Sequence, residues 1–334
     1  MIVNREQLLK QLEAVTPGLS PKAIIEQSDC FVFRKQKVIT FNDEIACRVA
    51  TKVDFEGAVP ADPLLKLLRK LQETELDMEV GEGGLKIRGK GRRAVVQLHQ
   101  EIVLPVETID RPSEWTPVGK NLLEALGMAI HCCSKDESKF VLTCVHVHPK
   151  WVESSDDVQI LRYKTKTGIS QATLVRGASV KYVVGMDVTE LSESESWIHF
   201  KGADGLIISC RRFKMDYPDT SAFIEQRGKK VKLPDGLDEA VEKAEIFSAQ
   251  NEMDNFVSVQ LSQDLLRLEG RGASGWYRES RKISYSSEPL KFFIDPRLLR
   301  EIRQRSDECE VAKGLLRVEG GSFVYATCTS EATD

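Results

Sequence analysis

The sequence has no apolar stretch of the length that a membrane-spanning helix needs. The longest apolar run, Val59–Leu71, is interrupted by charged residues well short of the ~20 residues required. The first residues, Met1–Glu6, lack the basic-then-apolar pattern of a secretion signal. With 41% hydrophobic and 29% charged residues, the composition is that of a globular protein. We therefore expect a cytoplasmic protein, and its 334 residues suit two or three domains.

Clustered metal ligands and catalytic groups are also scarce. The eight cysteines include no CxxC pair, which favours reduced thiols over a disulfide framework. Cys144, His146 and His148 would share one face of a strand, with His131–Cys133 nearby, and could bind zinc. Strand residues also alternate for core packing, and no HExxH spacing supports a metal site. We expect no metal and no cofactor.

Two glycine-rich segments, Gly81–Gly84 and Gly89–Gly91, could suggest a phosphate-binding loop. Neither precedes a predicted helix, which a phosphate cradle requires, so both are expected to be hairpin turns. Because no Ser-His-Asp arrangement or carboxylate pair stands out either, the sequence does not indicate an enzyme.

The chain also lacks an excess of positive charge. Its 47 basic and 51 acidic residues give a net charge of −4, which taken alone argues against a nucleic-acid partner. The charges are nevertheless segregated along the chain, and the segregation follows an internal repeat.

Two segments match almost residue for residue, Asp62–Lys70 and Asp295–Arg303, and a weaker copy lies at Thr173–Met186. Asp followed by Pro predicts a helix start in the first two, with the carboxylate of Asp62 or Asp295 as the N-terminal cap. A second type of amphipathic helix is predicted ahead of each copy, at 5–15, 120–130 and 237–247. Three units of ~110 residues result. The predicted domains are 1–115, 116–230 and 231–334.

The repeated helix has one basic face. In the first copy Leu64, Leu65, Leu67, Leu68 and Leu71 form an apolar stripe, and Lys66, Arg69 and Lys70 lie opposite. In the last copy Arg297, Arg300 and Arg303 cover the face away from the apolar residues. Such a face is usually only solvated, but solvated faces usually mix charges of both signs. The repetition predicts unopposed positive charge and a shared polyanionic partner.

Several motifs resemble those of one family. Val59–Leu65 is similar to a "VPA…LL" helix entry, Leu85–Arg93 to the hairpin after it, and Val103–Ile109 to an "LPA-x-x-F" ending. Ser155–Ile160 stands in the place of "TDGHRL", and Asp216–Asp219 resembles "FPDY". These are motifs of the beta sliding clamp of bacterial DNA polymerase III, and the resemblance, divergent in exact residues, covers nearly the whole chain.

The resemblance implies an α+β fold of three repeated clamp domains, each with two helices packed on antiparallel sheets. It also implies a head-to-tail homodimeric ring around double-stranded DNA, acting as a processivity factor without enzymatic activity. Phosphate contacts carry no sequence information, so they permit sliding. The candidate DNA-binding residues are Lys66, Arg69, Lys70, Lys181, Arg297, Arg300 and Arg303, with Arg5, Lys10 and Lys120 on the first helices.

The resemblance also implies a pocket for short linear motifs of the polymerase and the clamp loader. Its residues would be Leu142, Ser155, Asp157, Val158, Gln159, Ile160, Pro218, Phe223, Val324 and Ala326. Here Val158-Gln159 replaces the family's His-Arg, and the tail lacks its Met-Pro-Met ending. These residues could instead be packed strand residues.

The expected dimer interface has Ile109 on one side and Ile246 with Phe247 on the other, although a core position suits Ile246 and Phe247 nearly as well. A second class of function stays open: a clamp-like scaffold that binds partners without encircling DNA.

Overall fold

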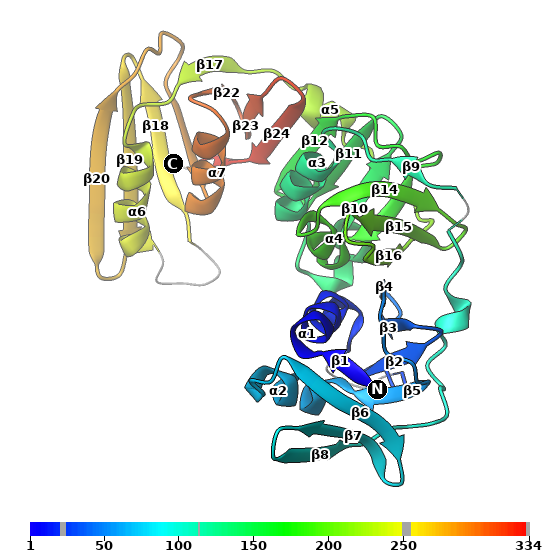
Figure 1. Cartoon of the computed structure of the whole chain (residues 1–334). Helices are drawn as coiled ribbons and strands as arrows, with labels where there is room; N and C mark the ends of the chain where they lie inside the picture. The colour runs from blue at the N-terminus through cyan, green and yellow to red at the C-terminus, as the bar shows by residue number, and fades with distance from the viewer. Residues whose placement is uncertain (21–24, 113, 249–254, 332–334) are drawn as a thin grey trace. The chain divides into compact units, whose positions relative to one another are not determined.

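The computed structural model describes residues 1–20, 25–112, 114–248 and 255–331. The chain divides into two compact units. Unit 1 comprises residues 1–130, 144–149 and 166–215, and unit 2 comprises residues 131–143, 150–165 and 216–334. Each unit is an α+β structure of antiparallel sheets and short helices (Figure 1).

Unit 1 contains an eight-stranded sheet, in the spatial order β5 (Gly57–Pro60), β2 (Cys30–Arg34), β3 (Lys37–Phe41), β4 (Ile45–Ala50), β16 (Ile207–Arg211), β15 (Trp197–Gly202), β14 (Val188–Glu193) and β9 (Thr116–Pro117). A second sheet has the order β1 (Ile2–Asn4), β6 (Glu75–Gly81), β7 (Gly84–Gly89) and β8 (Arg92–Val96). Strands β10 (Cys144–His148) and β13 (Thr173–Arg176) pair with each other.

The hairpin turns lie where glycine predicts them. Gly81 pairs with Gly84, and Gly89 pairs with Arg92, which leaves two-residue turns. Gly83 and Gly91 have φ angles of +86° and +71°, a region that glycine enters without steric cost. Both segments are therefore hairpin turns, as predicted.

The helices of unit 1 form two adjacent pairs, α1 (Arg5–Ala14) with α2 (Ala61–Lys70) and α3 (Leu122–Ala129) with α4 (Gly177–Val184). Asn4 caps α1, because its side chain accepts from the amide of Gln7 at 2.9 Å. The predicted cap of α2 is wrong: the helix begins one residue before Asp62, whose carboxylate pairs with Lys66 instead.

Unit 2 contains a sheet portion in the order β11 (Trp151–Ser155), β12 (Gln159–Lys164), β24 (Phe323–Cys328), β23 (Leu315–Glu319), β22 (Glu308–Ala312) and β17 (Lys229–Lys232). A five-stranded sheet follows the order β20 (Gly275–Lys282), β19 (Leu265–Gly272), β18 (Val257–Ser262), β21 (Leu290–Ile294) and β25 (Ser330–Glu331). Its helices are α5 (Ser221–Glu225), α6 (Leu237–Ser248) and α7 (Pro296–Arg305).

Helices α6 and α7 pack against each other (Figure 1). Asp295 caps α7 as predicted, since its carboxylate accepts from the amide of Arg297 at 2.8 Å. The short 3₁₀ helices are η1 (Thr16–Gly18), η2 (Val106–Thr108), η3 (Ile130–Cys132) and η4 (Glu137–Thr143).

The repeat is visible as one recurring connection. Strands β5, β13 and β21 each run directly into a helix, α2, α4 and α7, and each of these helices has one further helix ahead of it in the chain. Strand pairing crosses the predicted domain boundaries, because β4 pairs with β16 and β12 pairs with β24. The boundaries after residues 115 and 230 therefore stay a prediction.

Candidate nucleic-acid interface and partner surfaces

Helix α2 has the amphipathic arrangement that the sequence predicts. Leu64, Leu65 and Leu68 are buried, and Lys66 and Lys70 are exposed. The expectation that no acid opposes this basic face is wrong. Lys66 pairs with Asp62 at 2.8 Å one turn earlier, and Arg69 pairs with Glu13 of the neighbouring helix α1 at 3.0 Å.

Helix α7 departs from the expectation in the same way. Arg297 pairs with Asp295, Arg300 with Glu245 of α6, and Arg303 with Asp307. The cause is helix pairing: α6 carries four acidic residues against a single lysine, so it presents carboxylates to the arginines of α7. Arg297 is the most accessible of the three, with 71% of its side chain exposed.

Four lysines on or beside the helices carry a positive charge that no carboxylate offsets. In the part of the chain that the structure describes, none of the four has an ion pair: Lys10, Lys70, Lys120 and Lys181. All four are exposed. Arg5 differs, because it donates to the backbone carbonyls of Glu73 at 2.9 Å and Leu68 at 3.1 Å. Its guanidinium is thus occupied in holding α1 to α2.

The apolar residues of the predicted peptide pocket come together in unit 2. Ile160, Val324 and Ala326 form one core cluster with Ile224 and Leu315, and Phe223 packs against it. Ile160 and Ala326 are cross-strand partners on β12 and β24. The three strand residues are at most 7% exposed, so only Phe223 of this group offers surface to a partner.

The remaining predicted pocket residues form a polar rim. Asp157 pairs with Lys139, and the Ser155 hydroxyl donates to the Gln159 carbonyl at 2.8 Å. The Gln159 side chain accepts from the Tyr325 hydroxyl at 2.9 Å. Val158 is 47% exposed, Pro218 is exposed and Leu142 is half-buried.

A buried polar network fixes α5 against these strands. Glu153 on β11 pairs with Arg162 on β12, and the Thr220 hydroxyl donates to Glu153 at 2.9 Å. Arg317, 1% exposed, donates to the Ile224 carbonyl at 3.0 Å and pairs with Glu310 at 3.3 Å. Buried charges that are paired and hydrogen-bonded in this way specify one arrangement of the elements around them.

The predicted dimer-interface residues lie in different surroundings. Ile246 on α6 is 67% exposed and Phe247 is half-buried, so Ile246 does not belong to the core. Ile109 lies in the connector after η2 and packs against the core cluster around Trp197. It is not on an edge strand.

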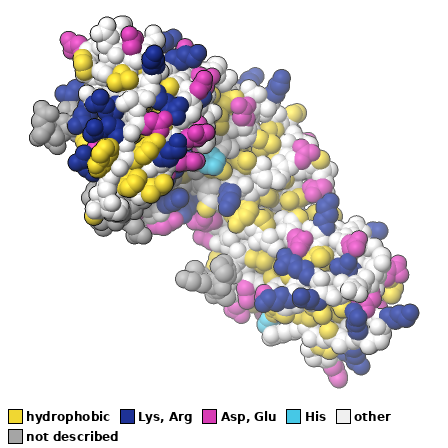
Figure 2. All heavy atoms as spheres, turned by 90° about the vertical axis from the view of Figure 1, so that its left-hand side faces the viewer, with side chains coloured by type: hydrophobic (Ala, Val, Ile, Leu, Met, Phe, Trp, Pro, Cys, Tyr) yellow, Lys and Arg dark blue, Asp and Glu magenta, His cyan; other side chains and the backbone are white. Residues whose placement is uncertain are grey.

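Two exposed side chains that sequence reasoning missed do lie on edge strands. Val95 on β8 is 50% exposed and Trp276 on β20 is 58% exposed, and each strand ends its sheet. Exposed and half-buried residues alternate along the whole of β20, which places Trp276 on its exposed face. The sequence of this strand has no matching alternation of apolar and polar residues, so it gave no signal. Figure 2 views the molecule from the side on which β20 lies in Figure 1, and shows hydrophobic side chains beside basic and acidic ones there.

Burial disfavours the thiolate form of two cysteines. Burial raises the pKa of Cys47 and of Cys309 to about 12, which keeps both protonated at neutral pH. Among the described residues, no group of three or more His, Cys, Asp and Glu is placed to hold a metal ion. No helix in the described ranges is long and apolar enough to cross a membrane.

No family model matches the sequence. A search of curated proteins gives no match either. Solved structures do match. The sliding clamp, DNA polymerase III subunit beta, of Bartonella birtlesii bound to griselimycin is 16% identical, with 99% of each chain covered and a TM-score of 0.86. DNA polymerase III beta subunit from Thermotoga maritima is 14% identical, covers 99% of each chain and has a TM-score of 0.84.

The DNA polymerase sliding clamp of Bacillus subtilis is 15% identical to the chain, with 99% of each chain covered and a TM-score of 0.83. At such identities a structural likeness establishes the fold. Over nearly its full length, and with a strongly divergent sequence, the chain folds as the beta sliding clamps of DNA polymerase III do.

Proposed function

We propose that the chain is a DNA sliding clamp: two copies close head to tail into a ring around duplex DNA, and the ring tethers a polymerase without catalysing a reaction itself. The observation that carries the proposal is the full-length clamp fold combined with exposed lysines on or beside the helices. The solved proteins that share the fold are DNA polymerase clamps by name.

The DNA contacts in this proposal come from four lysines that have no ion-pair partner among the described residues, and from Arg297, which stays accessible although it pairs with Asp295. Lys10, Lys70, Lys120 and Lys181 are exposed and unpaired within the described residues, and Arg297 is the most accessible arginine of α7. A lysine that swings between water and phosphate makes contacts that are easily exchanged for those of the next base pair. Weak, exchangeable contacts of this kind suit sliding.

The ring interface in this proposal joins two sheet edges. Strand β8 ends one sheet of unit 1 and strand β20 ends one sheet of unit 2. Each has backbone N–H and C=O groups available to a further strand. Val95 on the first edge, and Trp276 on the second together with Ile246 of helix α6, which packs against β20, would supply the buried apolar centre of such an interface.

Retention on circular DNA tests the proposal. Copies are dissociated by dilution, reassembled at micromolar concentration with nicked circular plasmid, and separated from free protein by gel filtration. The native chain is expected to stay with the circle and to be released when the plasmid is cut. Release by a single cut distinguishes enclosure from affinity.

The matched variants locate the contact surface. Glutamate at Lys70, Lys120, Lys181 and Arg297 is expected to abolish retention. The control places glutamate at four exposed lysines outside the helices, Lys52, Lys164, Lys166 and Lys232, and is expected to retain the circle. Equal loss in both variants would show a general charge effect and contradict the assignment to the helices.

Solution mass tests the assembly. A ring of two copies has twice the 37.5 kDa of one chain. Asp at Ile246 and Trp276 is expected to give monomers at micromolar concentration, while Asp at Met215, which is 51% exposed elsewhere, is expected to leave the dimer intact. A native chain that stays monomeric across this range contradicts the ring.

The pairing of the basic helices favours one alternative function. Because Arg69, Arg300 and Arg303 are neutralised by carboxylates, the helices are less basic than the sequence alone predicts. A clamp-like scaffold that recruits partners without enclosing DNA would not need strongly basic helices. Such a scaffold would bind partner peptides yet show no retention that depends on an uncut circle.

A further inference from the structure

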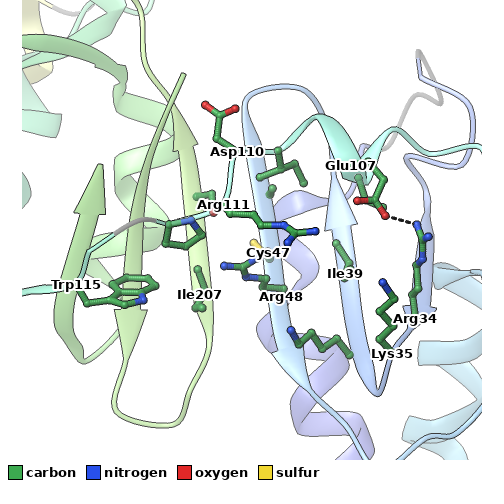
Figure 3. A pocket seen from close by; sticks show the side chains of 16 residues that line it. Arg34, Lys35, Ile39, Cys47, Arg48, Glu107, Asp110, Arg111, Trp115 and Ile207 are labelled. Carbon is green, nitrogen blue, oxygen red and sulfur yellow. Dashed lines mark ion pairs between the residues drawn. The ribbon is translucent and has the colours of Figure 1, made fainter. Parts of the chain in front are cut away.

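A pocket of about 670 Å³ lies in unit 1, on the eight-stranded sheet where β4 pairs with β16. Strands β3, β4 and β16 form its floor, and the connector that carries η2 and residues 109–112 forms one wall (Figure 3). Its volume is in the range of sites that hold small ligands or peptide side chains.

The pocket has an excess of positive charge. Five basic and two acidic residues line it: Arg34, Lys35, Lys37, Arg48 and Arg111, against Glu107 and Asp110. Both acids already have partners, and one of them neutralises a basic residue of the pocket itself. Glu107 pairs with Arg34 at 2.6 Å, and the Asp110 carboxylate accepts from the amide of Ser196 at 2.9 Å.

Two guanidinium groups remain in the centre. Arg48 rises from β4 and Arg111 reaches in from the connector (Figure 3). In the described part of the chain, neither has a carboxylate within ion-pair distance. Burial and the charge of Arg111 lower the pKa of Arg48, so the two cations disfavour each other. An anion between them would relieve this repulsion.

The corresponding position of unit 2 shows what is missing. There Arg162 on β12 stands opposite Glu153 on β11, to which it is paired, and opposite Val324 on the other side. In unit 1 Arg48 stands opposite Ile39 on β3 and Ile207 on β16. An isoleucine thus occupies the place of the internal carboxylate. Unit 1 has the arginine without its counter-ion.

We propose that this pocket binds an acidic peptide segment of a partner protein, whose carboxylate takes the place between Arg48 and Arg111 that Glu153 takes in unit 2. A guanidinium binds a carboxylate with two parallel hydrogen bonds, which gives both strength and orientation. Ile39, Ile109 and half-buried Trp115 line the same pocket and accept an apolar residue next to the acidic one.

The sheet face distinguishes this site from a DNA contact. Ile207 and Ser209 line the pocket, whereas Ile208 between them lines a hollow with Ala14 and Tyr182 of helices α1 and α4. Successive strand residues point to opposite faces, so the pocket opens on the face away from these helices. A ligand in the pocket and DNA at the helices would not compete.

The probe is a fluorescein-labelled eight-residue peptide with two glutamates followed by leucine and phenylalanine, compared with the same peptide carrying glutamines. Binding is measured by fluorescence anisotropy on the full chain. The acidic peptide is expected to bind, and the glutamine peptide to bind at least about tenfold more weakly, as the loss of a charge-assisted contact predicts.

Three variants test the geometry. Arg48→Met and Arg111→Ala each remove one side of the proposed carboxylate site. Ile39→Glu instead places a carboxylate opposite Arg48, so the pocket becomes internally neutral like its counterpart in unit 2. All three are expected to weaken binding of the acidic peptide by about tenfold or more. Lys166→Glu, an exposed charge change in unit 1 outside the pocket, is the control and is expected to bind normally.

Three results would overturn the proposal. The first is no binding of the acidic peptide at millimolar concentration. The second is equal binding by the native chain and by Ile39→Glu, which circular dichroism must show to be folded. The third is competition by a 20-base-pair duplex that depends on Arg48, which would assign the pocket to DNA.

Discussion

The unpaired lysines and the paired arginines of the helices are expected to differ in how much they contribute to DNA binding. An unpaired lysine gains a phosphate and releases one counter-ion, and each such contact adds about 0.9 to the slope of log K against log salt. An arginine that already has a carboxylate must lose or share its partner first. The lysines should therefore dominate the salt dependence.

The first variant changes all four unpaired lysines, Lys10, Lys70, Lys120 and Lys181, to glutamine. If each contacts one phosphate, the slope should fall by roughly 3 to 4 per chain. The second variant removes two ion pairs without changing the net charge, by glutamine at Glu13, Arg69, Glu245 and Arg300. Its slope should stay within about 1 of the native value.

The assay measures the anisotropy of a fluorescent 20-base-pair duplex at six salt concentrations. The Arg69–Glu13 pair is about half exposed, and such a pair contributes only about 0 to 1 kcal/mol. Replacing both members of the less exposed Arg300–Glu245 pair leaves no unpaired charge, so both variants should remain folded, as circular dichroism can verify. The reasoning is refuted if the charge-neutral variant lowers the slope as much as the lysine variant does. It is also refuted if removing the four lysines leaves the slope unchanged.

Three further predictions concern stability. Burial lowers the pKa of His199 from 6.5 to about 4, so only the unfolded chain takes up a proton as the pH falls below 6.5. Urea titrations should show an unfolding free energy about 2 kcal/mol smaller at pH 5 than at pH 7.5, a difference that His199→Gln removes. Arg317→Met should lower the unfolding free energy by about 1 to 3 kcal/mol in the same titration, because the buried Ile224 carbonyl loses its donor while Glu310 keeps only Arg227 as an ion-pair partner. Gly270→Ala should lower the melting temperature in calorimetry, because its Cβ would lie 1.9 Å from the backbone oxygen of Ala244 on α6.

Local patterns predicted most of the helices and turns. The predicted helices at 5–15 and 237–247 are α1, Arg5–Ala14, and α6, Leu237–Ser248, because apolar spacing and an N-terminal cap depend only on neighbouring residues. The third, predicted at 120–130, forms over Leu122–Ala129. Two glycine turns were placed correctly for the same reason.

The ion pairs that neutralise the basic helices could not be predicted from local patterns. The carboxylate partner of Arg69 lies 56 residues earlier in the chain, and that of Arg300 lies 55 residues earlier. Each pair forms only because two helices of the repeat pack together. A helical wheel describes one helix at a time, so it shows the basic face and omits the acids that the neighbouring helix brings to it.

The same limit, applied to strands, explains why the basic pocket was not predicted. Arg48 and Arg162 are alike in sequence terms, since each lies between two hydrophobic residues of a strand. Their difference lies in the cross-strand residue, Ile39 in one case and Glu153 in the other, and register is set by turns and sheet pairing outside the strand itself. The strand sets β3–β4–β16 and β11–β12–β24 have similar topology, and a single cross-strand position decides whether the central arginine has an internal carboxylate. In unit 2 Glu153 neutralises Arg162, whereas in unit 1 Arg48 keeps a positive charge that a ligand can neutralise.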